Sequence, residues 1–350
     1  MDNLTHTLVG VTLVRAGLGR GAAGATAAMV LSSNLPDADI VAAFDSSLAY
    51  FAWHRGPTHG PLGVVLLGPL SALLVVAWRA ARASTRAGAW DRFGTLAAVG
   101  VTGAALHVLM DLPTSYGTRA LSPFVETWYA LDWVPIIDIY IWGLLAIGFA
   151  RARWRPDARQ AIARAVLIGV IGIYATRATA HAFALGQAAS TRADGRAAPC
   201  ASAPTLTRHP TVIEAGAAGP GACLQAAALP SFFSPFSWRL VRQQSDGYEL
   251  RDVRLGHGPI ASVFVPSQHD QWVARARQAE TARVFYRFSR FPATQSAVLP
   301  DGTRRVRAMD VRFVGPPPRG LEPDPQTQPP FVMTVEIRPD GSVRSQRLGH

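Results

Sequence analysis

The chain has 350 residues, of which 49% are hydrophobic and only 16% are charged. Soluble proteins carry about 25% charged residues, so this composition disfavours a simple soluble enzyme and an intrinsically disordered chain. The net charge is +11, but the basic residues lie between apolar runs, which is typical of a membrane protein. Without one contiguous basic patch, we expect no nucleic-acid binding.

The start of the chain predicts a hairpin of two short helices. Leu4–Leu18 and Gly21–Asn34 are apolar, and the glycines between them favour a turn. At a rise of about 1.5 Å per residue, each arm spans roughly 20 Å. Such a hairpin would return residue 37 to the same side of a membrane as residue 2.

Four longer apolar runs follow the hairpin, and each approaches the roughly 20 residues that cross a bilayer. They are Pro61–Trp78, Gly94–Met110, Val134–Ala150 and Ala165–Leu185. The connections after the first and third runs are rich in arginine, which places them in the cytoplasm by the positive-inside rule. We therefore expect an all-α polytopic membrane domain over residues 1–187, formed by a helical hairpin plus four transmembrane helices.

The composition changes after residue 187. Residues 188–230 are rich in Ala, Pro and Gly and predict a linker, and residues 231–350 predict a small α+β domain outside the cytoplasm. Alternating segments predict a mainly antiparallel sheet in this domain. The expected strands are Trp238–Gln243, Gly247–Arg254, Ala282–Phe288, Arg304–Phe313 and Pro330–Arg338, and the expected helix is Gln268–Arg283.

Both cysteines of the chain, Cys200 and Cys223, lie in the expected linker. Disulfides form and persist in oxidising compartments outside the cytoplasm. The positions of the two cysteines on the expected outer side therefore predict a disulfide between them.

The histidines and carboxylates of the apolar half fall near one face of the expected membrane domain. Asp2 and His6 are four residues apart, as are His107 and Asp111, and this spacing brings two side chains to one face of a helix. The other candidates lie in the connections and are Asp37, Asp39, His54, Arg55, His59, Asp132 and Asp138. Imidazole and carboxylate together are ligands for Zn²⁺, Mn²⁺ or Fe²⁺, so the set predicts a divalent metal site.

Several of these residues also have ordinary structural explanations. Asp2 could cap the first helix, and Asp37 and Asp39 could end a helix beside Pro36. Arg55 could contact lipid headgroups at the membrane surface. The combination of all the candidates on one side favours the metal site over these separate explanations, because ionisable groups beside membrane helices are usually functional.

Six segments of this half resemble the family of bacterial inner-membrane metal-dependent hydrolases (YdjM-like). They are Met1–Gly10, Asn34–Asp39, His54–His59, His107–Asp111, Thr114–Thr118 and Leu131–Asp138. The resemblance covers roughly residues 1–185 and implies a multi-pass protein of the bacterial inner membrane. Gly60 departs from the family pattern, which has Ser after the second histidine, and we expect this change to remove a hydrogen bond to the substrate or a neighbouring ligand.

The order of these residues is also distantly similar to zinc-dependent phospholipase C and to the single-strand-specific secreted nucleases. That resemblance implies two zinc ions that share Asp111. The first site would comprise His6 and Asp111 with Asp2, and the second would comprise Asp37, His59, His107 and Asp111. Mn²⁺ and Fe²⁺ are alternative ions, and Asp39, Asp132 and Asp138 are additional candidate ligands.

These patterns together predict a membrane-bound hydrolase of a phosphoester in an amphiphilic or envelope-related substrate. Its expected partners are the lipid bilayer and a phosphorylated or lipid-like substrate. Asp37 would act as a ligand or general base, Arg55 would bind phosphate oxygens, and His54 would assist turnover.

Two other classes of function stay open at this stage. The first is a membrane transporter that handles metals or other ions, which would need essential polar residues at both membrane faces. The second is a membrane anchor for an outer binding domain, which predicts that substitutions of the candidate ligands have no effect.

Overall fold

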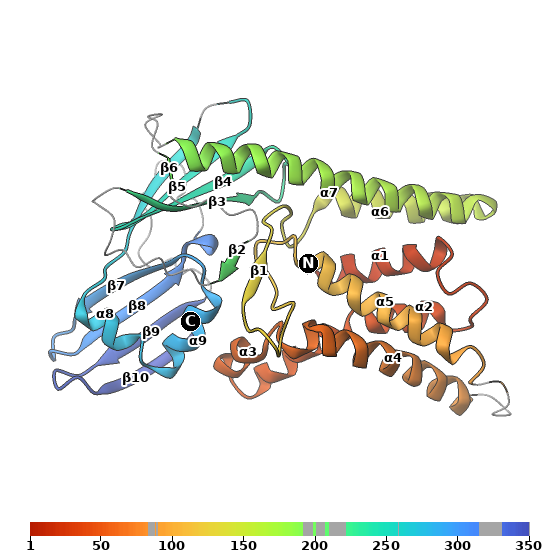
Figure 1. The fold of residues 1–350 in the computed structure, drawn as a ribbon, viewed down its shortest axis with the longest axis horizontal. Coiled ribbons are helices and arrows are strands. Elements are labelled where there is room, and N and C mark those ends of the chain that lie inside the picture. Colours follow the sequence, from red (N-terminus) through yellow and green to blue (C-terminus); the bar gives the residue numbers. More distant parts are fainter. Residues whose placement is uncertain are drawn as a thin grey trace. The chain divides into compact units, whose positions relative to one another are not determined.

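The computed structural model describes residues 1–82, 88, 90–191, 199–200, 207–209, 222–257, 259–314 and 331–349. The chain divides into two compact units (Figure 1). Unit 1 comprises Met1–Val41, Trp53–Thr179 and Phe232–Pro235, and unit 2 comprises Ala42–Ala52, Ala180–Ser231 and Phe236–His350. Each unit therefore contains one short segment from the opposite half of the chain.

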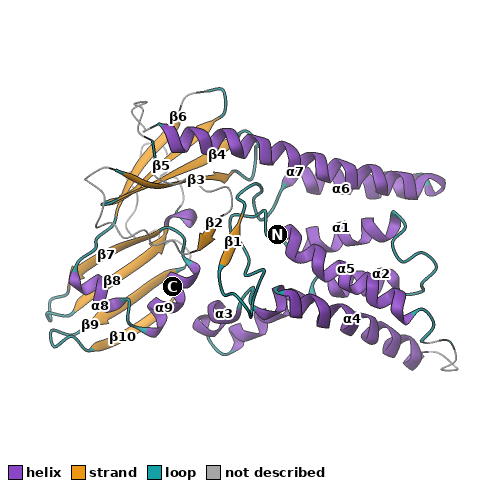
Figure 2. Cartoon of the chain, viewed as in Figure 1, coloured by secondary structure: helices purple, strands orange, loops and turns teal. Residues whose placement is uncertain are grey.

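The first 190 residues are mainly helical (Figure 2). The α-helices are α1 (Asn3–Arg15), α2 (Ala25–Ser32), α3 (Ser47–Trp53), α4 (Pro61–Arg82), α5 (Phe93–Asp111), α6 (Ile139–Trp154) and α7 (Arg159–Ser190). Three 3-10 helices and one short strand lie between them: η1 (Leu35–Phe44), η2 (Pro57–His59), η3 (Pro156–Ala158) and β1 (Trp128–Ala130).

Three helices in the described part of the chain are long and apolar enough to cross a membrane: α4, α5 and the helix Pro156–Ser190, which includes α7. The expectation of four transmembrane helices is therefore wrong. The Val134–Ala150 run forms α6, which has 16 residues and rises only about 24 Å. The carboxylate of Asp138 accepts hydrogen bonds from the backbone of Tyr140 and Ile141 and fixes the start of α6 after Val134.

Helices α1 and α2 pack against each other as antiparallel neighbours. The side-chain amide of Asn34, just after α2, donates a 2.8 Å hydrogen bond to the Thr7 hydroxyl near the start of α1. Within the pair, a Cβ on Gly10 would lie 2.8 Å from the Ser33 hydroxyl, so the two backbones approach closely there. The chain consequently returns, at the end of α2, to the end of unit 1 where α1 begins.

Helices α4 and α5 form the closest helix pair in unit 1. A Cβ on Gly100 would lie 2.2 Å from the carbonyl oxygen of Gly68, so glycine permits this approach. Small residues at helix interfaces are typical of membrane helix pairs. The opposite face of α4 exposes Val65, Leu66 and Leu74, which suits a surface in contact with lipid tails.

Unit 2 contains two antiparallel four-stranded sheets. The first has the order β3 (Cys223–Pro230), β4 (Ser237–Gln244), β5 (Gly247–Arg254), β6 (Pro259–Pro266). The second has the order β10 (Val343–Leu348), β9 (Val332–Ile337), β8 (Arg304–Asp310), β7 (Pro292–Val298). The remaining elements are β2 (Thr207–His209), α8 (Gln271–Ala276), α9 (Glu280–Phe288) and η5 (Val311–Phe313).

The expectation of a small α+β domain with one sheet is wrong, because the strands form two separate sheets. Ala282–Phe288, expected as a strand, belongs to α9, and the expected helix Gln268–Arg283 is divided between α8 and α9. Buried Ala282, Phe285 and Tyr286 recur at helical spacing and pack against the second sheet. The sequence of this segment alone fits a helix and a strand equally well, and packing against the sheet selects the helix.

The expected linker over residues 188–230 is also partly structured. Its end forms β3, whereas most of its middle lies outside the described residues. The predicted disulfide between Cys200 and Cys223 is confirmed.

Candidate metal centre

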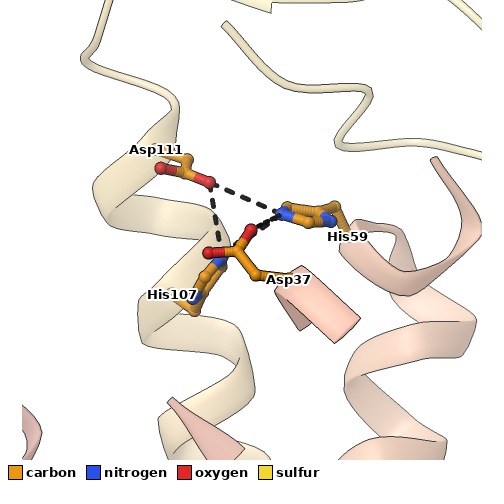
Figure 3. A group of neighbouring side chains, drawn as sticks. All are labelled: Asp37, His59, His107 and Asp111. Atoms are coloured by element: carbon orange, nitrogen blue, oxygen red, sulfur yellow. Dashed lines mark hydrogen bonds and ion pairs between the residues drawn. The ribbon is translucent and has the colours of Figure 1, made fainter. Parts of the chain in front are cut away.

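Four side chains from separate segments of unit 1 converge at one point (Figure 3). Asp37 comes from η1, His59 from η2, and His107 and Asp111 from the last turns of α5. One potential ligand atom from each residue lies within 4.8 Å of those of the other three. His59, His107 and Asp111 are buried, and Asp37 is partly buried. We call these four residues the Asp/His group.

The imidazole of His107 is oriented by the backbone of α2. Its Nδ1 lies 2.7 Å from the carbonyl oxygen of Ser33. A carbonyl oxygen only accepts hydrogen bonds, so Nδ1 carries the proton and Nε2 of a neutral His107 presents a lone pair. That Nε2 points into the group and lies 3.4 Å from Asp111 Oδ2.

The Nε2 atom of His59 also points into the group. It lies 3.2 Å from His107 Nε2, 3.3 Å from Asp37 Oδ1 and 3.6 Å from Asp111 Oδ2. On the other side of the ring, Nδ1 lies 3.1 Å from the Thr58 hydroxyl. The contact of Nδ1 with Thr58 therefore orients the ring so that Nε2 faces the carboxylates of Asp37 and Asp111.

The donor set fits a divalent transition metal. Asp37 Oδ1 and Asp111 Oδ2 are buried and have no hydrogen-bond partner in the described part of the chain, although buried polar atoms are normally satisfied. Burial raises the pKa of the Asp37 carboxyl, but the adjacent His107 and His59 imidazoles outweigh this effect and hold the pKa below its ordinary value. Two imidazole nitrogens and two carboxylate oxygens suit Zn²⁺, Mn²⁺ or Fe²⁺.

Asp111 presents its two oxygens to different neighbours. Oδ2 faces His59 and His107, whereas Oδ1 lies 3.5 Å from His6 Nε2 and contacts the Met1 amino group. The His6 ring stacks on the His107 ring at 3.9 Å. Both His6 ring nitrogens are buried without a hydrogen-bond partner among the described residues. The sequence-based pairing of His6 with Asp111 thus matches their positions in space.

Asp39 lies behind the group and orders the segment that carries His59. Its carboxylate accepts hydrogen bonds from the Arg55 backbone at 2.7 Å and the Thr58 hydroxyl at 3.3 Å, and lies 3.1 Å from His54 Nδ1. Burial lowers the pKa of the His54 imidazole, although the hydrogen bond to Asp39 opposes this effect. This environment therefore favours the neutral imidazole of His54.

Arg55 is buried beside the Asp/His group and faces it. One guanidinium nitrogen lies 3.2 Å from Asp111 Oδ1, and another donates a 2.7 Å hydrogen bond to the Gly117 carbonyl. Its backbone φ is +52°, in the left-handed region that costs a non-glycine residue about 1 kcal/mol or more. In the structure Arg55 therefore contacts Asp111 and Gly117, in place of the alternative contact with lipid headgroups.

Besides His6 and Asp39, three further candidate ligands lie outside the group. Asp2 is the N-cap of α1, and its carboxylate accepts a 3.0 Å hydrogen bond from the Thr5 backbone. Asp138 caps α6 and pairs with Arg177 at 2.7 Å. Asp132 is buried with a φ of +59° and is not a member of the group. Asp2 thus caps the first helix, as its alternative structural explanation predicts.

Two buried arginines near these elements were not among the residues predicted from the sequence. Arg177 lies in α7 and pairs with Asp138, and a single arginine inside an apolar run was a usable signal. Arg119 donates a 2.8 Å hydrogen bond to the His54 carbonyl, and it gave no comparable signal because it lies in an irregular connection. Arg119 therefore positions the segment that carries His54 and His59, whereas Arg177 holds the start of α6.

Gly60, which follows His59, packs directly against backbone. A Cβ at this position would lie 1.6 Å from the carbonyl oxygen of Ser122. The main effect of glycine at position 60 is therefore steric, rather than the expected loss of a hydrogen bond from a serine. Glycine here permits a close approach of two segments, and this chain has no room for a serine.

A helical membrane unit with a buried Asp/His group at one end defines a class of membrane protein with a candidate metal centre. The family model described as YdjM inner membrane protein matches residues 1–183, more than half of the 350 residues, and the chain belongs to this family. The match and the three apolar helices support an inner-membrane location.

The chain is also similar to a curated protein of unknown function, "Uncharacterized protein YfhP" of Bacillus subtilis (strain 168). The two are 28% identical over 179 residues, which are 48% of this chain and 52% of that protein. The chain thus spans about half the length of this relative. No solved structure matches the chain, and these comparisons do not show the distant similarity to phospholipase C and the secreted nucleases.

Proposed function

We propose that this protein is a membrane-bound, metal-dependent hydrolase that acts on a phosphoester. The observation that carries the proposal is the convergence of Asp37, His59, His107 and Asp111 within 4.8 Å, with the Nε2 lone pair of His107 directed inward by the Ser33 carbonyl. A divalent ion such as Zn²⁺, when bound, acts as a Lewis acid and lowers the pKa of its water toward neutrality.

Asp111 is placed to serve two ions. Its Oδ2 belongs to the Asp/His group, whereas its Oδ1 is oriented toward His6. Two-metal sites are common among enzymes that cleave phosphoesters, which favours this class of substrate. We therefore assign Asp37, His59 and His107 to one ion, His6 to the second, and Asp111 to both.

The residues around the group supply the remaining functions that hydrolysis of a phosphoester needs. The Arg55 guanidinium, which contacts Asp111, would bind phosphate oxygens of the substrate. His54 is held through Nδ1 by Asp39, so its Nε2 would accept a proton from the attacking water as a general base. Asp37 would hold the ion, and its partial exposure places it at the accessible side of the group.

The substrate we propose is amphiphilic, because the Asp/His group lies at one end of the helices that cross the membrane. By the positive-inside rule this end faces outward, so the protein would be multi-pass with an extracytoplasmic C-terminal unit. The polar residues collect at one end of unit 1, and this favours a reaction at the membrane surface over a path for ions.

The test is metal content combined with activity of the purified full-length chain. After removal of metal and reloading with Zn²⁺, Mn²⁺ or Fe²⁺, we expect hydrolysis of at least one lipid-like phosphoester by the wild type. Asp37→Asn should lose metal and activity. Asp132→Asn is the matched control, because Asn tolerates a left-handed backbone and Asp132 lies outside the group.

Three results would contradict the proposal. Wild-type protein that binds no metal under metal-replete conditions would remove its chemical basis. A loss of metal from Asp132→Asn equal to that from Asp37→Asn would show that the group is assigned wrongly. Metal-loaded protein that hydrolyses none of the phosphoesters would remove the substrate class.

A further inference from the structure

Unit 1 has a cavity at the end opposite the Asp/His group. The connection between α1 and α2 and the start of α7 line this open cavity of about 480 Å³, a volume within the range of small-molecule sites. These elements lie at the right-hand end of unit 1 in Figure 1. Arg15, which lines the cavity, follows His6 along α1 by nine residues, about 14 Å of helix.

The cavity is lined by three arginines, Arg15, Arg20 and Arg159. The one lining carboxylate is Asp157, and its ion-pair partner is Arg155, at 3.3 Å, which does not line the cavity. Among the described residues, no carboxylate forms an ion pair with any of the three arginines. Like charges that share a cavity repel one another, so this arrangement favours an anion between them.

Neighbouring contacts fix the walls of the cavity. The Arg15 guanidinium lies over the Phe149 ring at 4.2 Å. The Gln160 side chain donates a 3.0 Å hydrogen bond to the carbonyl of Ala16, and Arg164 donates another at 3.2 Å. The Ala16 carbonyl, which follows the last residue of α1, thus accepts two hydrogen bonds from α7.

The start of α7 lines the same side of the cavity. Arg159 and Gln160, in the first turn of α7, both line it. The Arg159 N–H donates a hydrogen bond to the Pro156 carbonyl of η3, so the side chains of this turn, rather than its backbone, are available to an anion. Arginine side chains from two segments that line one cavity match the oxygens of a phosphate group.

From this juxtaposition we propose that the cavity is a binding site for a phosphate group, separate from the Asp/His group. The phosphate would belong either to the headgroup of an anionic phospholipid or to a soluble phosphate compound. Both sources present the same oxygens to Arg15, Arg20 and Arg159. Because this is the arginine-rich end of the unit, the site would face the cytoplasmic leaflet.

The experiment measures thermal unfolding of the detergent-purified full-length chain with three probes: phosphatidylglycerol, phosphatidylcholine and inorganic phosphate. A site-specific ligand at 100 times its Kd should raise Tm by about 5 °C or more. We expect phosphatidylglycerol or inorganic phosphate to do so, and phosphatidylcholine to give a smaller shift. A shift with phosphatidylglycerol alone identifies the lipid as the source, and a shift with inorganic phosphate alone identifies the soluble compound.

The test variant is the double substitution R15Q/R159Q. The matched control is the double substitution R151Q/R153Q, which removes two exposed arginines at the end of α6 that do not line the cavity. The anion-dependent shift should disappear in the first variant and persist in the second, while the metal content of both equals that of the wild type. The absence of any anion-dependent shift in the wild type would overturn the proposal. Equal loss of the shift in both variants would do the same, because it would indicate general attraction to basic residues. A direct count of bound phospholipid in each variant keeps the test valid if R15Q/R159Q is less stable.

Discussion

At the scale of single residues, Asp111 is the ligand whose two carboxylate oxygens face different histidines, His6 on one side and His59 and His107 on the other. Asp111→Asn keeps the shape of the side chain but removes the negative charge that offsets divalent cations. We expect bound metal to fall at both sites, whereas His6→Asn should reduce two ions per chain to one. Elemental analysis of each purified variant measures this stoichiometry. Full metal occupancy in Asp111→Asn would contradict the shared role of this carboxylate.

Substitutions of Asp39 and His54 should differ in their effects, although the two side chains contact each other. Asp39 positions both His54 and the segment of His59, so Asp39→Asn should weaken metal affinity about 10- to 100-fold. His54→Ala should leave affinity nearly unchanged and lower turnover. Competition with a chelator measures the affinity, and equal affinities of the two variants would show that Asp39 does not act through His59.

In unit 2, the buried carboxylate of Asp310 predicts sensitivity to acid. It accepts hydrogen bonds from Ser289 at 3.0 Å and the Arg290 backbone at 2.9 Å, and it pairs with Arg312 at 2.8 Å. Burial raises its pKa, but the Arg312 charge and these hydrogen bonds outweigh that effect and lower the pKa from the ordinary value of 3.8. This stabilisation is therefore complete above pH 3.8 and is lost as pH falls below that value toward the folded pKa.

The corresponding substitution is Asp310→Ala, which leaves Arg312 buried without its partner. We expect it to destabilise unit 2 by about 3–5 kcal/mol at pH 7, as measured by faster hydrogen exchange of the β7 and β8 amides. Asp301→Ala removes an exposed carboxylate of the same unit and should change exchange little. Equal protection in the two variants would argue against the importance of the Asp310 pair.

At the scale of elements, the contact between Gly60 and the Ser122 carbonyl joins the start of α4 to the connection after α5. Gly60→Ser must separate these segments, which should cost about 3 kcal/mol and weaken metal binding through the adjacent His59. Gly172→Ala in α7 is the control, because a Cβ there meets no atom within 4 Å. Thermal unfolding should show a lower Tm for the first variant and an unchanged or higher Tm for the second.

The elements also show what the sequence could and could not predict. The apolar runs that became α4 and α5 were visible because their length is unusual, and β5 matches its predicted bounds, Gly247–Arg254. α9 was mistaken for a strand because its apolar residues fit both periods and only packing against the second sheet selects the helix. The strands β6, β7 and β10 were missed because their neighbours across the sheet, rather than their own alternation, determine their pairing.

The candidate site was more predictable than the fold. His and Asp residues are rare in apolar segments, so Asp37, His59, His107 and Asp111 stood out without any knowledge of three-dimensional contacts. The supporting contacts were not predictable, because the Ser33 carbonyl and the backbone of Arg55 carry no side-chain signal. Asp2, Asp132 and Asp138 shared the chemistry of the ligands, and only their positions in space separate them.

At the scale of the whole molecule, the basic connections predict a topology. Arg79 donates a hydrogen bond to the Ala23 carbonyl, and Gln160 donates one to the Ala16 carbonyl, so the end of α4 and the start of α7 meet the α1–α2 connection. We expect reporter fusions after residues 85 and 157 to indicate the cytoplasm. Fusions after residues 45, 120 and 350 should indicate the periplasm, and a cytoplasmic signal at residue 45 would contradict the helical hairpin.

The exchange of short segments between the two units has a consequence for biogenesis. The strip Phe232–Pro235 belongs to unit 1, where the Ser234 carbonyl accepts a hydrogen bond from Arg177 and the Phe233 carbonyl accepts one from Tyr140. During translation, the membrane helices leave the ribosome well before this strip, and Ala42–Ala52 emerges long before the sheets it joins. We therefore expect neither unit to be complete until the chain has emerged beyond Pro235.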